Sequence, residues 1–160
     1  ECSISAVRLY DDKGQLTESV ETGSPLAVEV DLQRGDHILD MACTVGIFNE
    51  SHAKCWEIAI PSLITLDGAL QGKHTLRVDL TSLPLVPGRY FLNLGIYPLD
   101  WSYLYDRHWQ MYPLNITGAR TTGPGVYAQG MLFLDVRVGV KNTALLDVSS
   151  DTVRRDAMGA

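Results

Sequence analysis

Basic residues and cysteines are scarce in this chain, and long apolar runs are absent. Its 13 Lys and Arg residues are outnumbered by 19 Asp and Glu residues, which gives a formal net charge of −6. That balance disfavours nucleic acid and anionic membrane surfaces as partners. No apolar run approaches the ~20 residues that a helix needs to cross a bilayer. No signal peptide opens the sequence, so we expect Glu1 to lie at a domain boundary within a longer protein.

The three cysteines do not suggest a disulfide framework, because Cys2, Cys43 and Cys55 are few and odd in number. Cys43 and Cys55 flank a predicted turn near residues 50–52. Symmetric pairing across that turn places Cys55 opposite roughly Ile47, so Cys43 lies too far along its strand for a disulfide. We therefore predict reduced thiols, which are typical of a cytosolic protein.

Apolar and polar residues alternate with a period of two through most of the chain, which indicates strands with one wet face. The predicted strands are residues 4–10, 26–32, 42–48, 54–60, 76–80, 90–97, 109–117 and 131–140. Helical periodicity is limited to short turns within 63–70 and 150–158. Seven to eight short strands separated by turn signals predict an all-β, immunoglobulin-like antiparallel β-sandwich over residues 1–140, followed by a C-terminal tail, 141–160.

A Pro-Gly turn, Pro87 and Gly88, precedes the strand at 90–97. The whole segment 83–90 reads LPLVPGRY. It is typical of a tyrosine corner, in which a Tyr hydroxyl near the start of a late strand bonds to the upstream backbone. We therefore predict a structural role for Tyr90.

Catalytic and metal-binding patterns are weak. The sequence has no nucleophile elbow. Cys43, His52 and Cys55 could supply three metal ligands, but a second close pair of ligands is missing, and buried thiols are common. Asp100 and Asp106 could resemble the carboxylate pair of a glycosidase, but loop aspartates more often cap turns. We predict that the chain is not an enzyme and holds neither a metal nor a cofactor.

Aromatic residues gather on one predicted surface. In an immunoglobulin-like sandwich, the strands near 43–48, 90–97 and 109–117 would be C, F and G of one sheet. The side chains that alternation then predicts to point into the core are those of Val45, Ile47, Tyr90, Leu92, Leu94, Ile96, Tyr112, Leu114 and Ile116. On the outer face we expect Gly46 and Gly95 to form a low floor. The predicted ligand-binding residues around it are Thr44, Phe48, Phe91, Asn93, Tyr97 and Trp109, with Trp101 and Tyr103 as a rim.

Such a face has two interpretations. Aromatic rings pack against the C–H faces of sugars, while amide and hydroxyl groups bond sugar hydroxyls. An exposed apolar patch can equally be covered by another chain or by a later segment. The sequence therefore predicts either a glycan site or a protein interface on this sheet.

The chain also resembles a known family, the C-terminal carbohydrate-binding domain of the ATP-binding subunit of O-antigen polysaccharide ABC exporters (Wzt type). The resemblance spans roughly residues 4–138, and no single motif is highly specific. The matching segments are VRLYDDKG at 7–14, GSPLAV at 23–28, GIFN at 46–49, LPLVPGRY at 83–90, and Asp106 ahead of the strand that ends LNI at 114–116.

The resemblance implies an immunoglobulin-like sandwich attached to a nucleotide-binding domain that this chain lacks. It implies a non-catalytic module that recognises the terminal region of a lipid-linked O-polysaccharide at the cytoplasmic face of the bacterial inner membrane. The nucleotide-binding domain and the membrane subunit of the exporter would be its partners. It further implies a homodimer, in which strand 131–140 could be exchanged between protomers across a flexible connector, 118–130. The alternative is a structural or dimerisation β-sandwich whose aromatic face is a protein interface.

Overall fold

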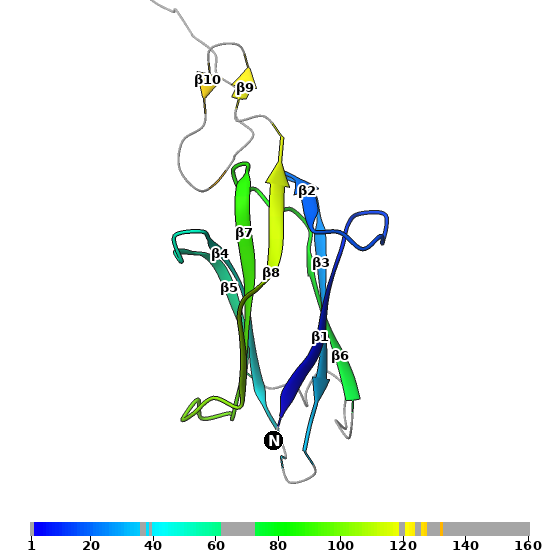
Figure 1. Ribbon diagram of the computed structural model, residues 1–160, viewed down its shortest axis with the longest axis vertical. Helices are drawn as coiled ribbons and strands as arrows, with labels where there is room; N and C mark the ends of the chain where they lie inside the picture. The colour runs from blue at the N-terminus through cyan, green and yellow to red at the C-terminus, as the bar shows by residue number, and fades with distance from the viewer. Residues whose placement is uncertain are drawn as a thin grey trace, which may run out of the picture.

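The computed structural model is a sandwich of two β-sheets, and it describes residues 2–35, 38, 40–61, 73–118, 121–123, 126–127 and 132. Figure 1 shows β1, β3 and β6 facing a second layer that contains β4, β5, β7 and β8. The strands are β1 (Ser3–Tyr10), β2 (Ser19–Glu21), β3 (Leu26–Gln33), β4 (Ala42–Asn49), β5 (Lys54–Ile60), β6 (Lys73–Leu80), β7 (Gly88–Tyr97), β8 (Asp106–Thr117), β9 (Thr121–Gly123) and β10 (Val126–Tyr127). The predicted all-β sandwich is confirmed. The described residues include no helix long and apolar enough to cross a membrane.

The strand order fixes which side chains share a surface. The smaller sheet has the order β1-β3-β6, and the larger has the order β2-β8-β7-β4-β5. The three strands predicted to be C, F and G are therefore neighbours, as expected. β4 and β8 flank β7, and both pairings are antiparallel. Side chains that point outward from these three strands consequently form one continuous surface.

Side chains from both sheets fill the space between them, as the alternation predicts. Each fully buried aliphatic side chain contributes about 1.5–3 kcal/mol to folding. Those with 0 % exposure include Val28, Val30, Val45, Ile47, Leu92, Ile96 and Leu114. The core thus uses one face of β4, β7 and β8 and leaves the opposite face for other roles.

The predicted tyrosine corner is confirmed. The hydroxyl of Tyr90 donates a hydrogen bond of 2.8 Å to the carbonyl oxygen of Val86, and both residues are buried. This bond closes the turn before β7 and anchors the ring in the core. It therefore helps to fix the register of the strand at the centre of the larger sheet.

The β4–β5 hairpin agrees with the prediction for its cysteines. A bulge next to the pair Ile47–Trp56 accommodates Cys55. Cys43 pairs with Ile60 at the far end of the hairpin, so the register rules out a disulfide between the two cysteines. Burial raises the pKa of the Cys43 thiol to about 12, which makes this thiol unreactive at neutral pH.

Three short strands are not predicted by the sequence. β2 pairs in parallel with the end of β8, and β9 and β10 form a separate two-stranded ribbon. The predicted connector, 118–130, therefore contains this ribbon, and its flexibility stays a prediction.

Several other predictions fall on residues that the structure does not describe. The helical turns within 63–70 and 150–158 and the tail 141–160 lie outside the described residues. So does strand 131–140, except Leu132, which forms an isolated bridge with Leu85. Exchange of this strand between protomers stays a prediction.

Candidate functional site

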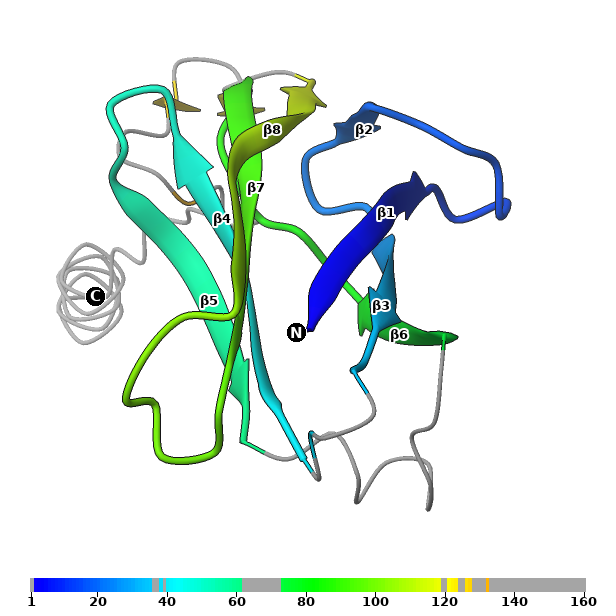
Figure 2. The same cartoon turned by 60° about the horizontal axis from the view of Figure 1, so that its bottom comes forward.

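The outer surface of the larger sheet carries the aromatic residues that the alternation predicts there. Figure 2 shows β5, β4, β7 and β8 side by side in this sheet. Register places Gly46 opposite Asn93, and Phe48 opposite Phe91. The residues between them along β7 and β4 are buried in the core, so these side chains lie on the outer side. We define the aromatic face as Thr44, Phe48, Phe91, Asn93, Tyr97 and Trp109.

The glycines of the face do not form the open floor that we predicted, because aromatic rings cover them. A Cβ atom on Gly95 would lie 2.7 Å from Cε2 of Tyr97, and one on Gly46 would lie 2.9 Å from Cε2 of Phe48. Each ring therefore lies in the space that its own strand's glycine leaves empty. Alternation predicts the face on which a ring lies but not its rotamer, which is why the prediction of a low floor is wrong.

Asn93 lies next to a contacting pair of rings, because it pairs with Gly46, whose Cα the Phe48 ring covers. Phe48 on β4 and Trp109 on β8 contact each other edge to face, with centroids 5.0 Å apart, so the pair spans β7 in the row of Asn93. Asn93 lies on the predicted face but is only 5 % exposed. Its Oδ1 accepts a 2.6 Å hydrogen bond from the backbone N–H of Gln110. Its Nδ2 is the one buried side-chain polar atom without a hydrogen-bond partner among the described residues.

A β-bulge in β8 sets the position of Trp109. Three residues, Trp109, Gln110 and Met111, stand opposite the single residue Asn93. The middle residue, Gln110, has φ 53°, a left-handed conformation that is uncommon outside glycine. Bulges of this kind re-aim side chains next to functional sites. Here the Asn93 side chain satisfies the N–H that the bulge frees, and Trp109 is directed toward Phe48.

Gln110 and His52 also belong to this site. Neither residue was predicted to lie on the aromatic face. The side-chain amide of Gln110 lies 2.6 Å from Nδ1 of His52, and His52 also has a left-handed backbone, with φ 64°. The turn between β4 and β5 is thereby joined to the bulge in β8. No sequence pattern identifies this contact, since a single His in a turn and a Gln in a strand are both ordinary. Among the described residues, no group of three His, Cys, Asp or Glu side chains is placed to hold a metal.

The loop between β7 and β8 carries the two rim residues. Trp101 contacts Tyr97, with ring centroids 4.9 Å apart, and is 40 % exposed. Tyr103 contacts Tyr105 instead, and Tyr105 packs against the core. The structure therefore joins Trp101 to the aromatic face, whereas Tyr103 extends the exposed loop. Thr44 lies at the same end of the sheet, half-buried opposite Gly95.

The two loop aspartates hold the backbone in place. Asp100 accepts hydrogen bonds from the N–H and the hydroxyl of Ser102, at 3.1 and 2.6 Å, and these bonds lower its pKa. Asp106 accepts a 2.7 Å bond from the N–H of Ile4, which ties β8 to β1. Both side chains thus act as backbone acceptors, as we expected for loop aspartates.

Three basic side chains lie over the rings of the aromatic face, in the geometry of cation–π pairs. Lys54 also forms an ion pair with Glu57. Neither Arg89 nor Arg107 has an ion pair among the described residues. The distances from the charged group to the ring centroid are 4.1 Å for Arg107 over Trp109, 5.2 Å for Arg89 over Phe91 and 5.9 Å for Lys54 over Phe48.

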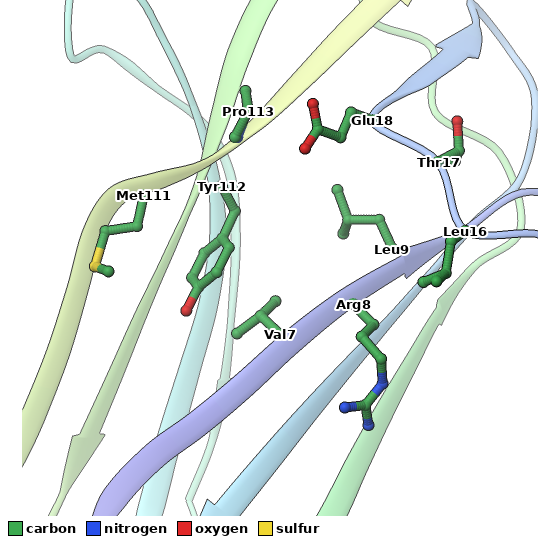
Figure 3. Close-up of a pocket in the computed structure, with 9 residues that line it drawn as sticks. All are labelled: Val7, Arg8, Leu9, Leu16, Thr17, Glu18, Met111, Tyr112 and Pro113. Atoms are coloured by element: carbon green, nitrogen blue, oxygen red, sulfur yellow. The ribbon is translucent and has the colours of Figure 1, made fainter.

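A separate hollow of about 450 Å³ lies between β1 and β8, at the edge of the sandwich (Figure 3). Its lining is mainly aliphatic, and the hydroxyl of Tyr112 there is hydrogen-bonded to His108. Arg8 at its border is already bonded to Asp31. The other polar side chains that line the hollow are those of Thr17 and Glu18. Its lining includes Val7, Leu9, Leu16, Met111, Tyr112 and Pro113.

Comparison with known proteins matches the chain to one protein family. The model of the Wzt C-terminal domain matches residues 1–132. A solved structure described as the crystal structure of the C-terminal domain of wzt is similar in fold, with a TM-score of 0.67 and 11% sequence identity, over 88% of this chain and 84% of that chain. No curated protein matches the chain. The chain belongs to the Wzt C-terminal domain family, which supports, at the level of the family, a carbohydrate-binding and non-catalytic role in O-antigen export.

Proposed function

We propose that the chain binds the terminal region of a lipid-linked O-antigen polysaccharide through its aromatic face and thereby selects it for export. Family membership supports a glycan ligand, and the face supplies the two kinds of contact that sugar recognition needs. The rings of Phe91, Tyr97 and Trp109 offer apolar surface to the C–H faces of sugar rings. Thr44 offers a hydrogen bond to a sugar hydroxyl, and Nδ2 of Asn93 offers another once the neighbouring Trp109 ring turns aside.

The observation that carries this proposal is the combination of aromatic rings with charged groups on one wet surface. Trp109 is 38 % exposed, and Arg107 lies directly over its ring. Arg and aromatic residues are both enriched in protein interfaces, but burying Arg89 and Arg107 there without counter-charges would be costly. A shallow sugar site leaves both groups hydrated and able to bond. The surface therefore favours a glycan over the alternative of a protein interface.

The depth of the face sets the strength of binding that we expect. Phe48 and Asn93 are buried, so the surface open to a ligand is formed by the rings and cations above them. Shallow, wet sites of this kind bind weakly, because much of the ligand stays in solvent and ordering costs remain. Attachment of the domain to an exporter would compensate by raising the local concentration of the bound glycan at the transporter.

In this proposal the domain works within a larger assembly. Its partners are the nucleotide-binding domain and the membrane subunit of the exporter, at the cytoplasmic face of the bacterial inner membrane. Two copies form a homodimer that presents two glycan sites, which increases avidity without new contacts. Light scattering during size-exclusion chromatography tests the dimer, and a monomer at micromolar concentration would contradict it.

A binding titration with two variants tests the site. We would titrate the domain with O-polysaccharide from its own strain and with one from an unrelated serotype, and follow tryptophan emission and heat release. Trp109→Ala and Asn93→Ala should each weaken binding of the cognate glycan by about tenfold, because each removes one contact worth about 1–2 kcal/mol. Leu16→Ala is the control, since Leu16 is 68% exposed and lies in the β1–β2 connection, away from the face.

The possible results of this titration distinguish support for the site from its rejection. Circular dichroism must first show that each variant keeps its strand content. Saturable binding of the cognate glycan alone, lost in both face variants but kept in Leu16→Ala, supports the site. Unchanged binding in both face variants rejects it, and a wild-type domain that binds neither polysaccharide rejects the proposed function.

A further inference from the structure

The polar groups that the aromatic face leaves without a protein partner are mainly hydrogen-bond donors. The guanidinium groups of Arg89 and Arg107 have no ion pair among the described residues, and Nδ2 of Asn93 has no partner there. The strong acceptors nearby are occupied. Oδ1 of Asn93 accepts from a backbone N–H, and Glu57 is paired with Lys54. A ligand that satisfies this surface must itself supply acceptors.

Arg89 and Arg107 lie on either side of Asn93 along the sheet, because Arg89 pairs with Asn115 and Arg107 pairs with Gly95. Arg89 and Asn93 both point outward from β7, with Phe91 between them, because the alternate residues of β7 are buried. Arg89 leans over Phe91 toward the row of Asn93. On β8, Arg107 leans over Trp109, which stands opposite Asn93 in the bulge. Each guanidinium group therefore lies over the ring of a residue that neighbours Asn93, and the two come from opposite ends of the face.

The smaller sheet shows how arginines are otherwise placed in this chain. On the outer side of β1, β3 and β6, Arg8 makes two 2.6 Å hydrogen bonds to Asp31, and Arg77 makes a 2.9 Å bond to Glu29. The chain has 19 acidic residues against 13 basic ones, so carboxylates are not in short supply. On the aromatic face, by contrast, Arg89 and Arg107 have no ion pair among the described residues, and Nδ2 of Asn93 has no partner there. Local positive charge in an acidic chain is complementary to an anionic ligand.

We propose that the glycan recognised here is acidic and that its oxyanion, a carboxylate or a phosphate group, binds between Arg89 and Arg107. This inference rests on the proposed function and narrows its ligand to a chemical class. Guanidinium groups bind both oxyanions through paired, charge-assisted N–H···O bonds. An oxygen of the same group accepts from Nδ2 of Asn93 once the Trp109 ring, which covers this amide together with Phe48, turns aside.

Charge variants of the arginines test the inference by calorimetric titration with O-polysaccharide from the strain that encodes the chain. Arg89→Gln and Arg107→Gln should each weaken binding by about tenfold or more, as expected for losing a hydrogen bond between charged groups. Arg107→Lys keeps the charge but loses the planar fork, so it should bind with intermediate affinity. Lys13→Gln is the matched control, because it makes the same charge change in the exposed β1–β2 turn. Wild-type affinity should fall as ionic strength rises.

Chemically modified ligand identifies the oxyanion and separates this inference from the proposed function. One sample of the polysaccharide is reduced at its carboxyl groups, and another has its phosphodiesters removed with hydrofluoric acid. Binding lost on carboxyl reduction identifies a carboxylate, and binding lost on phosphate removal identifies a phosphate. If both modified samples bind as the native one does, or if the native glycan binds and has neither group, the inference is overturned while the proposed function stands. If the native glycan does not bind, both are overturned.

Discussion

Replacing Tyr90 with Phe tests whether the corner before β7 stabilises the sheet that carries the aromatic face. The substitution keeps the ring and removes only the hydroxyl, which donates a 2.8 Å hydrogen bond to the carbonyl of Val86. Tyr90 is 4 % exposed and Val86 is 9 % exposed, so water reaches neither group easily. A buried acceptor left without its donor costs about 1–3 kcal/mol. We therefore expect the free energy of unfolding to fall by about 1–2 kcal/mol, with the native fold retained.

Urea unfolding followed by circular dichroism measures this change. The slope of the transition should stay constant while its midpoint falls, because the substitution exposes no additional surface on unfolding. Tyr97→Phe is the matched control, since Tyr97 ends the same strand on the opposite face and its hydroxyl has no hydrogen bond in the described part of the chain. A loss below about 0.5 kcal/mol in Tyr90→Phe, the size typical of surface substitutions, would refute a stabilising role for the corner.

Two further predictions concern the two outer surfaces. Hydrogen bonding to Arg8 holds the pKa of Asp31 at about 2, below its usual value of about 3.9, so the stability it contributes is complete above about pH 4 and is lost as the pH falls toward 2. The difference in unfolding free energy between the wild type and Asp31→Asn should therefore shrink over that interval, and a difference that stays constant would contradict this pair. In Gly95→Ala, the new methyl group would lie 2.7 Å from the Tyr97 ring, so the ring must turn away. Calorimetry should then show weaker glycan binding with little loss of stability, and wild-type affinity would show that the ring position does not matter.

Much of the sandwich could be predicted because its signals are local. A strand with one buried face repeats every two residues, and the residues of β4 and β7 that belong to the hydrophobic core cluster follow that period. The corner at Tyr90 was predictable for a similar reason, since a Pro-Gly turn fixes the chain just before the strand. β2 was missed because three residues carry too little of any period, and its pairing with β8 depends on contacts distant in sequence.

The site was harder to predict because its geometry depends on contacts between distant residues. The sequence gives no sign that three residues of β8 stand opposite Asn93, because two extra residues leave the alternation of the strand in phase on either side of the bulge. Its left-handed residue, Gln110, is held by the side chains of Asn93 and His52, which come from another strand and another turn. Alternation therefore places Trp109 on the correct face but does not show that it packs on Phe48.

The spacing of glycine and aromatic residues offers a signal that alternation alone does not use. In Gly46-x-Phe48 and in Gly95-x-Tyr97, a ring two residues beyond the glycine lies on the glycine of the same strand. A ring held against its own strand in this way has fewer rotamers available than a ring free in solvent. Side chains already ordered before binding lose less rotamer entropy when a ligand arrives. The two glycines therefore stabilise a preformed surface, and the exposed loop with Trp101 supplies the part of the site that can adapt.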